Sequence, residues 1–120
     1  MEIIIILILF TFSGIFEAIM DKIQFHYNKS IFPKNSLFWN PELSWKNKYK
    51  DDLKTPKFFG STTFFVIFTD AWHLLKYIMI LAIAISVLLA FLFNVTLIMG
   101  CIIVFLCLVA FVIGFDIAYI

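Results

Sequence analysis

The chain has 120 residues, of which 63% are hydrophobic and only 14% are charged. A soluble domain carries roughly 45–50% apolar and about 25% charged residues, so this composition indicates that lipid surrounds much of the chain. The formal net charge of +1 gives no reason to expect nucleic acid as a partner. At this length we expect a single membrane domain covering residues 1–120.

The first apolar run predicts a membrane-spanning helix over about residues 3–22, with an extension to about residue 28. Glu2 stands where a secretory signal carries basic residues, and no Ala-x-Ala cleavage site follows, so we expect the helix to be retained. Polar residues recur along one helical face of this stretch. They are Ser13, Glu17, Asp21, Gln24 and Asn28.

Residues 29–60 are predicted to form an ordered loop that is rich in lysine and aromatic residues. The loop contains all three prolines, which argue against one regular element. Its aromatic residues argue against disorder, because disordered segments are poor in them. Since Trp and Tyr favour the headgroup level of a bilayer, we expect the loop to lie there. The aromatic residues concerned are Phe32, Phe38, Trp39, Trp45 and Tyr49.

A second helix is expected over about residues 62–93, beginning near Ser61 or Thr62. It is too long for one bilayer, because 32 residues rise roughly 48 Å against a hydrocarbon core of about 30 Å. Lys76 should extend to the interface, which leaves residues 77–93 as the membrane-spanning part. Three placements stay open for residues 62–75: cytoplasmic, interfacial or re-entrant.

A tight turn at Asn94-Val95 is expected to lead into a third spanning helix over about residues 96–116. Eight of the nine lysines lie between residues 22 and 57, whereas the turn carries no charge. We therefore expect the protein in the cell (inner) membrane. The positive-inside rule places the loop and the C-terminus on the cytoplasmic side, and the N-terminus and the turn on the outer side. We therefore predict an all-α integral membrane protein with three transmembrane helices.

A polar interruption in the second apolar run is the main candidate site. Asp70, His73 and Tyr77 share one helical face because they are spaced by three and four residues. Counting along antiparallel helices places several ionisable side chains within about 10 Å of one level, with Glu17 about one turn deeper. These side chains are Asp21, Asp70, His73, Lys76 and Asp116.

Three interpretations of this cluster stay open. The first is structural, with the charges marking the interface and Lys76 paired with Asp21 or Glu17. The second is a metal site for Zn, Mn or Fe, with Glu17 as a catalytic base and Trp72, Lys76 and Tyr77 as neighbouring site residues. Its predicted ligands are Asp21, Asp70, His73 and Asp116. The third is a haem bound by His26 and His73.

About half of the chain resembles a family of small bacterial membrane proteins to which no activity is attached. The resemblance is carried by Phe-Trp-Asn-Pro at 38–41, Leu-Ser-Trp-Lys-Asn-Lys-Tyr at 43–49, Phe-Phe-Gly-Ser-Thr-Thr at 58–63 and Thr-Asp-Ala-Trp-His-Leu at 69–74. It implies a membrane location and no function.

The sequence favours a structural or accessory membrane subunit whose ordered loop is the interaction surface. Three helices barely enclose a site, so we expect a homo-oligomer or a place in a larger membrane complex, in contact with the lipid bilayer. One alternative is a membrane-embedded, metal-dependent enzyme that acts on lipid or headgroup substrates. Another is a small pore or holin-like protein, which the lack of a polar stripe through the outer half of the helices disfavours.

Overall fold

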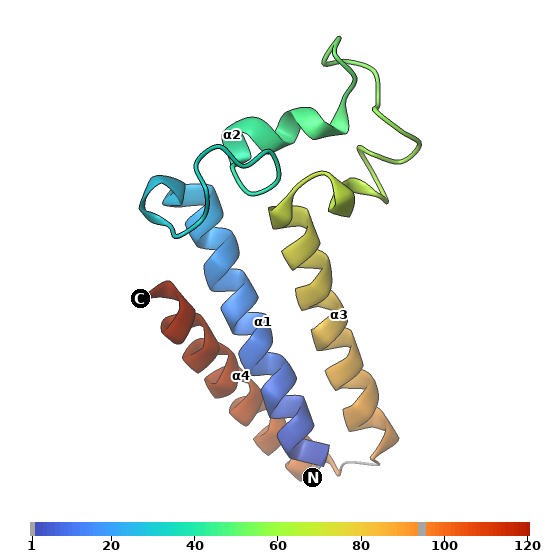
Figure 1. The fold of residues 1–120 in the computed structure, drawn as a ribbon. Coiled ribbons are helices and arrows are strands. Elements are labelled where there is room, and N and C mark those ends of the chain that lie inside the picture. The colour runs from blue at the N-terminus through green and yellow to red at the C-terminus, as the bar shows by residue number, and fades with distance from the viewer. Residues whose placement is uncertain (1, 94–95) are drawn as a thin grey trace. The chain divides into compact units, whose positions relative to one another are not determined.

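The structure is a computed structural model that describes residues 2–93 and 96–120, and its regular elements are all helices (Figure 1). The described residues contain no strand; Tyr49 and Pro56 form an isolated bridge. The turn expected at Asn94-Val95 lies outside the described residues. The elements are α1 (Glu2–Phe25), η1 (Tyr27–Lys29), α2 (Pro41–Ser44), η2 (Trp45–Lys48), η3 (Val66–Phe68), α3 (Ala71–Leu92) and α4 (Leu97–Tyr119).

Three of these helices, α1, α3 and α4, are long and apolar enough to cross a membrane. Their 24, 22 and 23 residues correspond to about 33–36 Å of helix, against a hydrocarbon core of about 30 Å. The predicted all-helical architecture with three such helices is confirmed. The expected extension to residue 28 differs in detail, because α1 ends at Phe25 and a short 3₁₀-helix, η1, follows.

The second long helix begins at Ala71, nine residues later than the sequence predicted. Asp70 occupies the position before it, and its carboxylate accepts a hydrogen bond from the backbone N–H of His73 at 2.9 Å. Such a bond is typical of a helix N-cap, because it satisfies one of the free N–H groups of the first turn. Residues 61–69 form turns and η3 instead. The prediction of a helix from residue 62 is therefore wrong, and α3 has the length of a single span.

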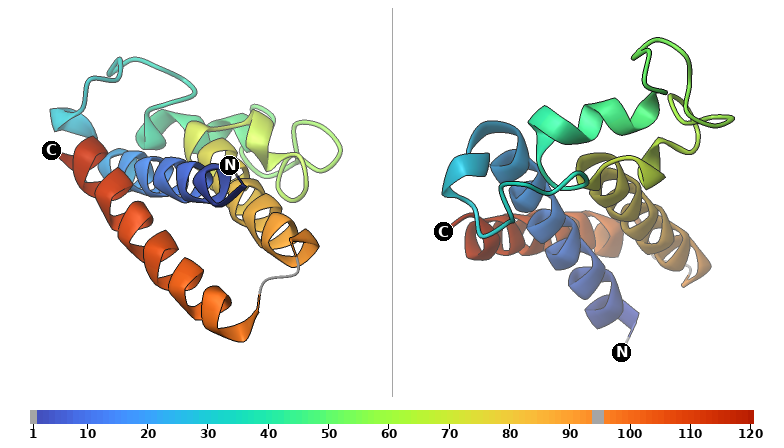
Figure 2. Two further views of the ribbon diagram at one scale, coloured as in Figure 1. Left: turned by 90° about the horizontal axis from the view of Figure 1, so that it is seen from below. Right: turned by 45° about the horizontal axis from the view of Figure 1, so that its top comes forward.

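The chain divides into two compact units, each described by itself. The first comprises the described residues of Met1–Ile19 and Ile78–Ile120. Within it, α1 and α4 touch through glycine (Figure 2): a Cβ atom on Gly14 would lie 2.0 Å from the Phe111 carbonyl oxygen, and one on Gly114 would lie 2.0 Å from that of Thr11. Only glycine permits such a close backbone approach.

Two buried serines in this first unit form hydrogen bonds within their own helices. The hydroxyl of Ser13 donates to the Leu9 carbonyl oxygen at 2.8 Å, and that of Ser86 donates to the Ala82 carbonyl oxygen at 2.8 Å. Both serines are buried. Serine hydroxyls can therefore sit in an apolar environment without leaving an unpaired polar group. The apolar core beside them consists of Ile6, Ile103 and Cys107, with Leu7, Phe10, Leu89 and Ala90 packed against it.

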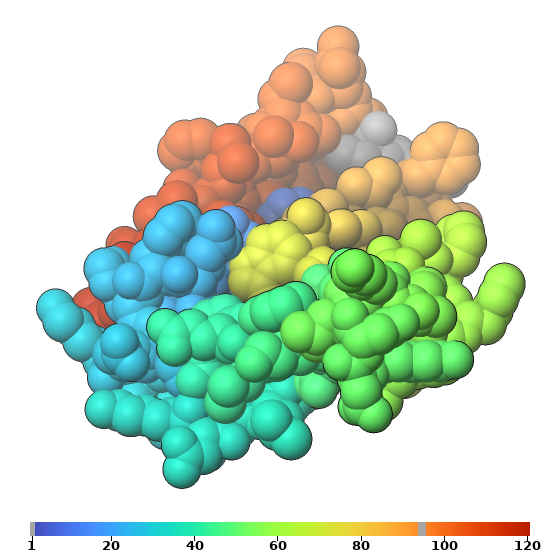
Figure 3. Space-filling model, turned by 90° about the horizontal axis from the view of Figure 1, so that it is seen from above, coloured from blue at the N-terminus to red at the C-terminus, as the bar shows by residue number. Residues whose placement is uncertain are grey.

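The second unit is Met20–Tyr77, and hydrogen bonds join parts of it that are far apart in the sequence. The backbone N–H of Ala71 donates to the Phe38 carbonyl oxygen at 2.9 Å. The Ser61 hydroxyl donates to the Lys48 carbonyl oxygen at 2.7 Å. In Figure 3 the cyan and green side chains of α2 and the following segment lie beside the yellow side chains at the start of α3. The long connection between α1 and α3 is thus folded onto the first turn of α3.

Candidate functional site

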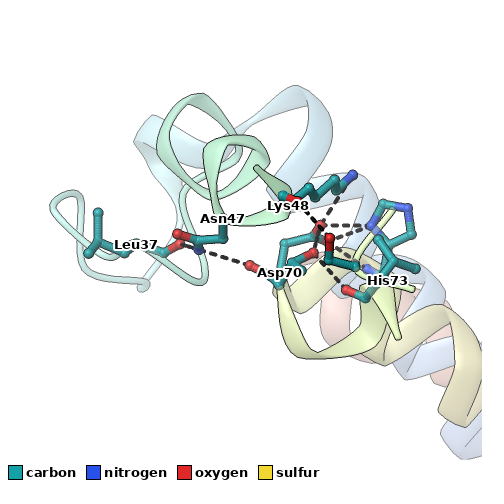
Figure 4. A network of polar contacts seen from close by, with 8 residues as sticks. Leu37, Asn47, Lys48, Asp70 and His73 are labelled. Atoms are coloured by element: carbon teal, nitrogen blue, oxygen red, sulfur yellow. Dashed lines mark hydrogen bonds and ion pairs between the residues drawn. The ribbon is translucent and has the colours of Figure 1, made fainter. Parts of the chain in front are cut away.

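The Asp70 carboxylate is the centre of a polar network in the second unit (Figure 4). Its side chain is only 7% exposed. The Nδ1 atom of His73 lies 2.7 and 2.8 Å from its two oxygens, and the Thr69 hydroxyl donates to Oδ2 at 3.2 Å. The ammonium of Lys48 lies 3.6 Å from Oδ2. A buried carboxylate needs such partners, because an isolated charge is costly to remove from water.

The contact between Asp70 and His73 orients the imidazole ring. Because Nδ1 faces a carboxylate, it is the donor in this contact, and Nε2 lies on the other side of the ring. The side chain of His73 is 29% exposed, so the ring is accessible. Asp70 occupies the position before α3 and His73 lies in its first turn, three residues later, so the two side chains meet at the start of the helix. The sequence predicted that Asp70 and His73 share one helical face and together bind a metal ion, but it did not predict their direct contact.

Asn47 joins the loop to the start of α3. Its side-chain amide donates to the Leu37 carbonyl oxygen and, at 2.9 Å, to that of Thr69. Leu37 and Thr69 are 32 residues apart in the sequence, so one side chain holds two distant backbone segments together. The neighbouring Lys48 reaches the Asp70 carboxylate. Sequence analysis did not single out Asn47 or Lys48 as site residues, because no local pattern connects η2 to a residue more than twenty positions later.

A cleft of about 280 Å³ opens beside this network. All three tryptophans of the chain, Trp39, Trp45 and Trp72, line it. Ile23 and Pro41 add apolar wall; Gln24, Ser44, Asp70 and His73 supply the polar lining. Binding sites for small molecules commonly combine apolar walls with a few polar groups in this way. Sequence analysis named Trp72 but not the other two tryptophans as site residues, since they lie in the loop.

Lysine side chains lie over two of these tryptophans. The Lys76 ammonium is 4.7 Å from the centroid of the Trp72 ring, and the Lys46 ammonium is 5.9 Å from that of Trp45. Both distances are typical of cation–π contacts. The ammonium of Lys76 thus lies over an aromatic ring, whereas the sequence predicted an ion pair with Asp21 or Glu17. Tyr77, another predicted site residue, is 45% exposed and does not line the cleft.

The described residues give no support to the predicted metal site. Among residues 2–93 and 96–120, no three His, Cys, Asp or Glu side chains come together as a group that could hold a metal ion. Asp21 belongs to the same compact unit as Asp70 but is not one of its contacts, whereas Glu17 and Asp116 belong to the other unit. Asp70 and His73 are thus two of the four predicted ligands, and they pair with each other. His26, the second predicted haem ligand, does not line the cleft that contains His73.

Comparisons of the chain with protein-family models, with curated proteins and with solved structures found no match. The site is therefore interpreted from its own geometry. That geometry offers an aromatic cleft, an imidazole held by a buried carboxylate, and lysines above the tryptophan rings.

Proposed function

We propose that the chain is a small, non-catalytic membrane subunit whose connection between α1 and α3 is a folded interaction surface. The three long apolar helices anchor it in the bilayer, with the lysine-rich connection and the C-terminus on the cytoplasmic side. The partner is a second copy of the chain or another membrane protein.

The Asn47 amide is the observation that carries this proposal. By binding the carbonyl oxygens of both Leu37 and Thr69, it gives a connection of more than forty residues a defined conformation. A flexible linker would need no such bond. The conformation leaves the tryptophan cleft open, with Trp45 43% exposed at its edge. Aromatic side chains in such positions are enriched at the centres of protein interfaces.

The proposal is tested by native gel electrophoresis of mildly solubilised membranes. The wild-type chain is expected to migrate as a complex larger than the monomer. Asn47→Ala and Trp45→Ala should shift it towards the monomer, because the first loosens the surface and the second removes a contact from it. Asn35→Ala is the matched control, since Asn35 is exposed in the same connection. A monomeric wild type, or complexes unchanged by both variants, would contradict the proposal.

A second candidate function rests on the Asp70–His73 pair. A carboxylate that holds Nδ1 of an imidazole is the arrangement used when histidine acts as a general base. The cleft would then hold a lipid or its headgroup, with Ser44 as a further polar group on its wall. The purified protein is incubated with liposomes of mixed phospholipids, and the lipids are analysed by mass spectrometry. Product that is lost in His73→Ala supports this candidate, and no product from the wild type contradicts it.

A further inference from the structure

Phenylalanine side chains are exposed throughout residues 58–68, the segment that precedes α3. Phe59 is 87% exposed, Phe64 75% and Phe68 67%, while Phe58 and Phe65 are 41% and 44% exposed. Single exposed apolar residues are ordinary on a protein surface, but five phenylalanines within eleven residues form a concentrated patch. Each ring that leaves water for an apolar environment contributes favourably, by about 1.5–3 kcal/mol when fully buried. The patch therefore favours an apolar partner.

The exposure is part of a defined backbone conformation. The Ser61 hydroxyl donates to the Lys48 carbonyl oxygen at 2.7 Å and accepts from the backbone N–H of Lys57 at 3.1 Å. The N–H of Phe65 donates to the Gly60 carbonyl oxygen at 2.9 Å. Gly60 has a φ of +77°, and a Cβ atom there would lie 2.8 Å from the Phe65 ring. The segment is thus folded around Gly60 and Ser61 while its phenylalanine rings stay outside.

The covalent chain restricts where this patch can be. Phe68 is three residues before Ala71, the first residue of α3, so the two lie within about 11 Å of each other. Because α3 is long and apolar enough to cross a membrane, the patch lies close to the surface where the helix enters in the proposed placement. Lys54 and Lys57 precede the patch and are exposed. Cations beside apolar rings are typical of segments that bind the surface of an anionic bilayer.

We propose that residues 58–68 insert their phenylalanine rings into the boundary between headgroups and acyl chains of the leaflet where α3 enters. Lys54 and Lys57 then lie at the anionic headgroups. The segment is an interfacial anchor that fixes the height of the folded connection on the membrane. This inference rests on the membrane placement of the proposed function, and it assigns residues 62–70 to the interface rather than to the cytoplasm or a re-entrant path.

The test uses the full-length protein in nanodiscs of phosphatidylcholine and phosphatidylglycerol. A benzoylphenylalanine photocrosslinker replaces Phe64, a change that keeps an aromatic ring at the position. It replaces Asp51 in the control, because Asp51 is exposed in the same connection but lies outside the patch. A third variant carries it at Val112 of α4, which is 56% exposed on a candidate span. Adducts are identified by mass spectrometry after illumination.

We expect lipid adducts when the photocrosslinker stands at position 64 or 112, and none when it stands at position 51. Lipid adducts at Val112 but not at Phe64 would overturn the anchor and leave the membrane placement intact. Adducts at Phe64 to a second copy of the chain would also overturn it, because protein would then cover the patch. If neither Phe64 nor Val112 gave lipid adducts, the membrane placement itself would fail.

Discussion

Asp70 and His73 are bound to each other twice, once through the backbone and once through the side chain. The Asp70 carboxylate accepts from the His73 backbone N–H at 2.9 Å and contacts its Nδ1 at 2.7 Å. The first interaction caps the N-terminus of α3, and the second orients the imidazole at the edge of the cleft. One carboxylate thus joins the start of a candidate span to the groups of the site.

Replacing Asp70 should destabilise the second unit. Asp70→Ala removes the N-cap of α3, which costs about 1 kcal/mol, and leaves buried polar groups unpaired at a further cost of about 1–3 kcal/mol. Asp70→Asn keeps a capping oxygen and should cost less. Denaturant unfolding of the detergent-solubilised protein, followed by tryptophan fluorescence, measures both because all three tryptophans line the cleft. Equal stability of Asp70→Ala and the wild type would show that the network does not hold the unit.

Asp52 should titrate at unusually low pH. Hydrogen bonds to its carboxylate lower its pKa from 3.8 to about 2. The largest effect comes from the Thr55 hydroxyl, and smaller ones come from the backbone N–H groups of Lys54 and Thr55. The stabilisation from these bonds is therefore present above pH 3.8 and is lost as the pH falls towards 2. Thr55→Ala should raise the pKa of Asp52 towards its ordinary value. Carboxyl chemical shifts measured by NMR against pH check this, and an unchanged pKa in Thr55→Ala would contradict it.

The three long apolar helices were predictable because each depends on a long apolar run. The start of α3 was not, because residues 64–68 are as apolar as the helix itself and only Thr69 and Asp70 separate them from Ala71. Hydropathy alone does not separate such a segment from a helix. The local signal was Asp70, a good N-cap residue, but Ser61 and Thr62 offered the same chemistry earlier in the chain. In the structure Ser61 binds the loop backbone at Lys48 instead.

The glycine contact between α1 and α4 should tolerate no added side chain. A Cβ atom at Gly14 or Gly114 would overlap a backbone carbonyl of the other helix, which cannot move without separating the helices. Gly14→Ala or Gly114→Ala should therefore lower the stability of the first unit by about 1–3 kcal/mol. Val112→Ala on the exposed face of α4 is the control and should have little effect. Thermal denaturation in detergent measures the difference, and tolerance of both glycine substitutions would show that the helices do not pack this way.

Metal content should be low and should not depend on His73. Among residues 2–93 and 96–120 no three His, Cys, Asp or Glu side chains form a group that could hold a metal ion, and the Asp70–His73 pair supplies two ligands where a catalytic site needs three. Elemental mass spectrometry of the purified protein should give far less than one Zn, Mn or Fe per chain, for the wild type and His73→Ala alike. Near-stoichiometric metal that is lost in His73→Ala would restore the metal-site interpretation.

The candidate site was predictable only where its residues are close in sequence. The pair Asp70 and His73 follows from helical spacing, and Trp72 lies between them. Trp39, Trp45 and Asn47 reach the site through the fold of the connection, which no periodicity encodes. Asp116 was predicted as a ligand by counting residues along ideal antiparallel helices. Such counting estimates the depth of a residue in the bilayer but not the direction of its side chain.

The central claim is that the connection between α1 and α3 is a folded unit held by Asn47 and Asp70. Hydrogen–deuterium exchange of the detergent-solubilised protein tests it most directly. We predict slow exchange in peptides covering residues 36–48 and 60–70 of the wild type, faster exchange of both regions in Asn47→Ala, and no change in Asn35→Ala. Exchange of these regions at the rate of an unfolded chain in the wild type would contradict the claim.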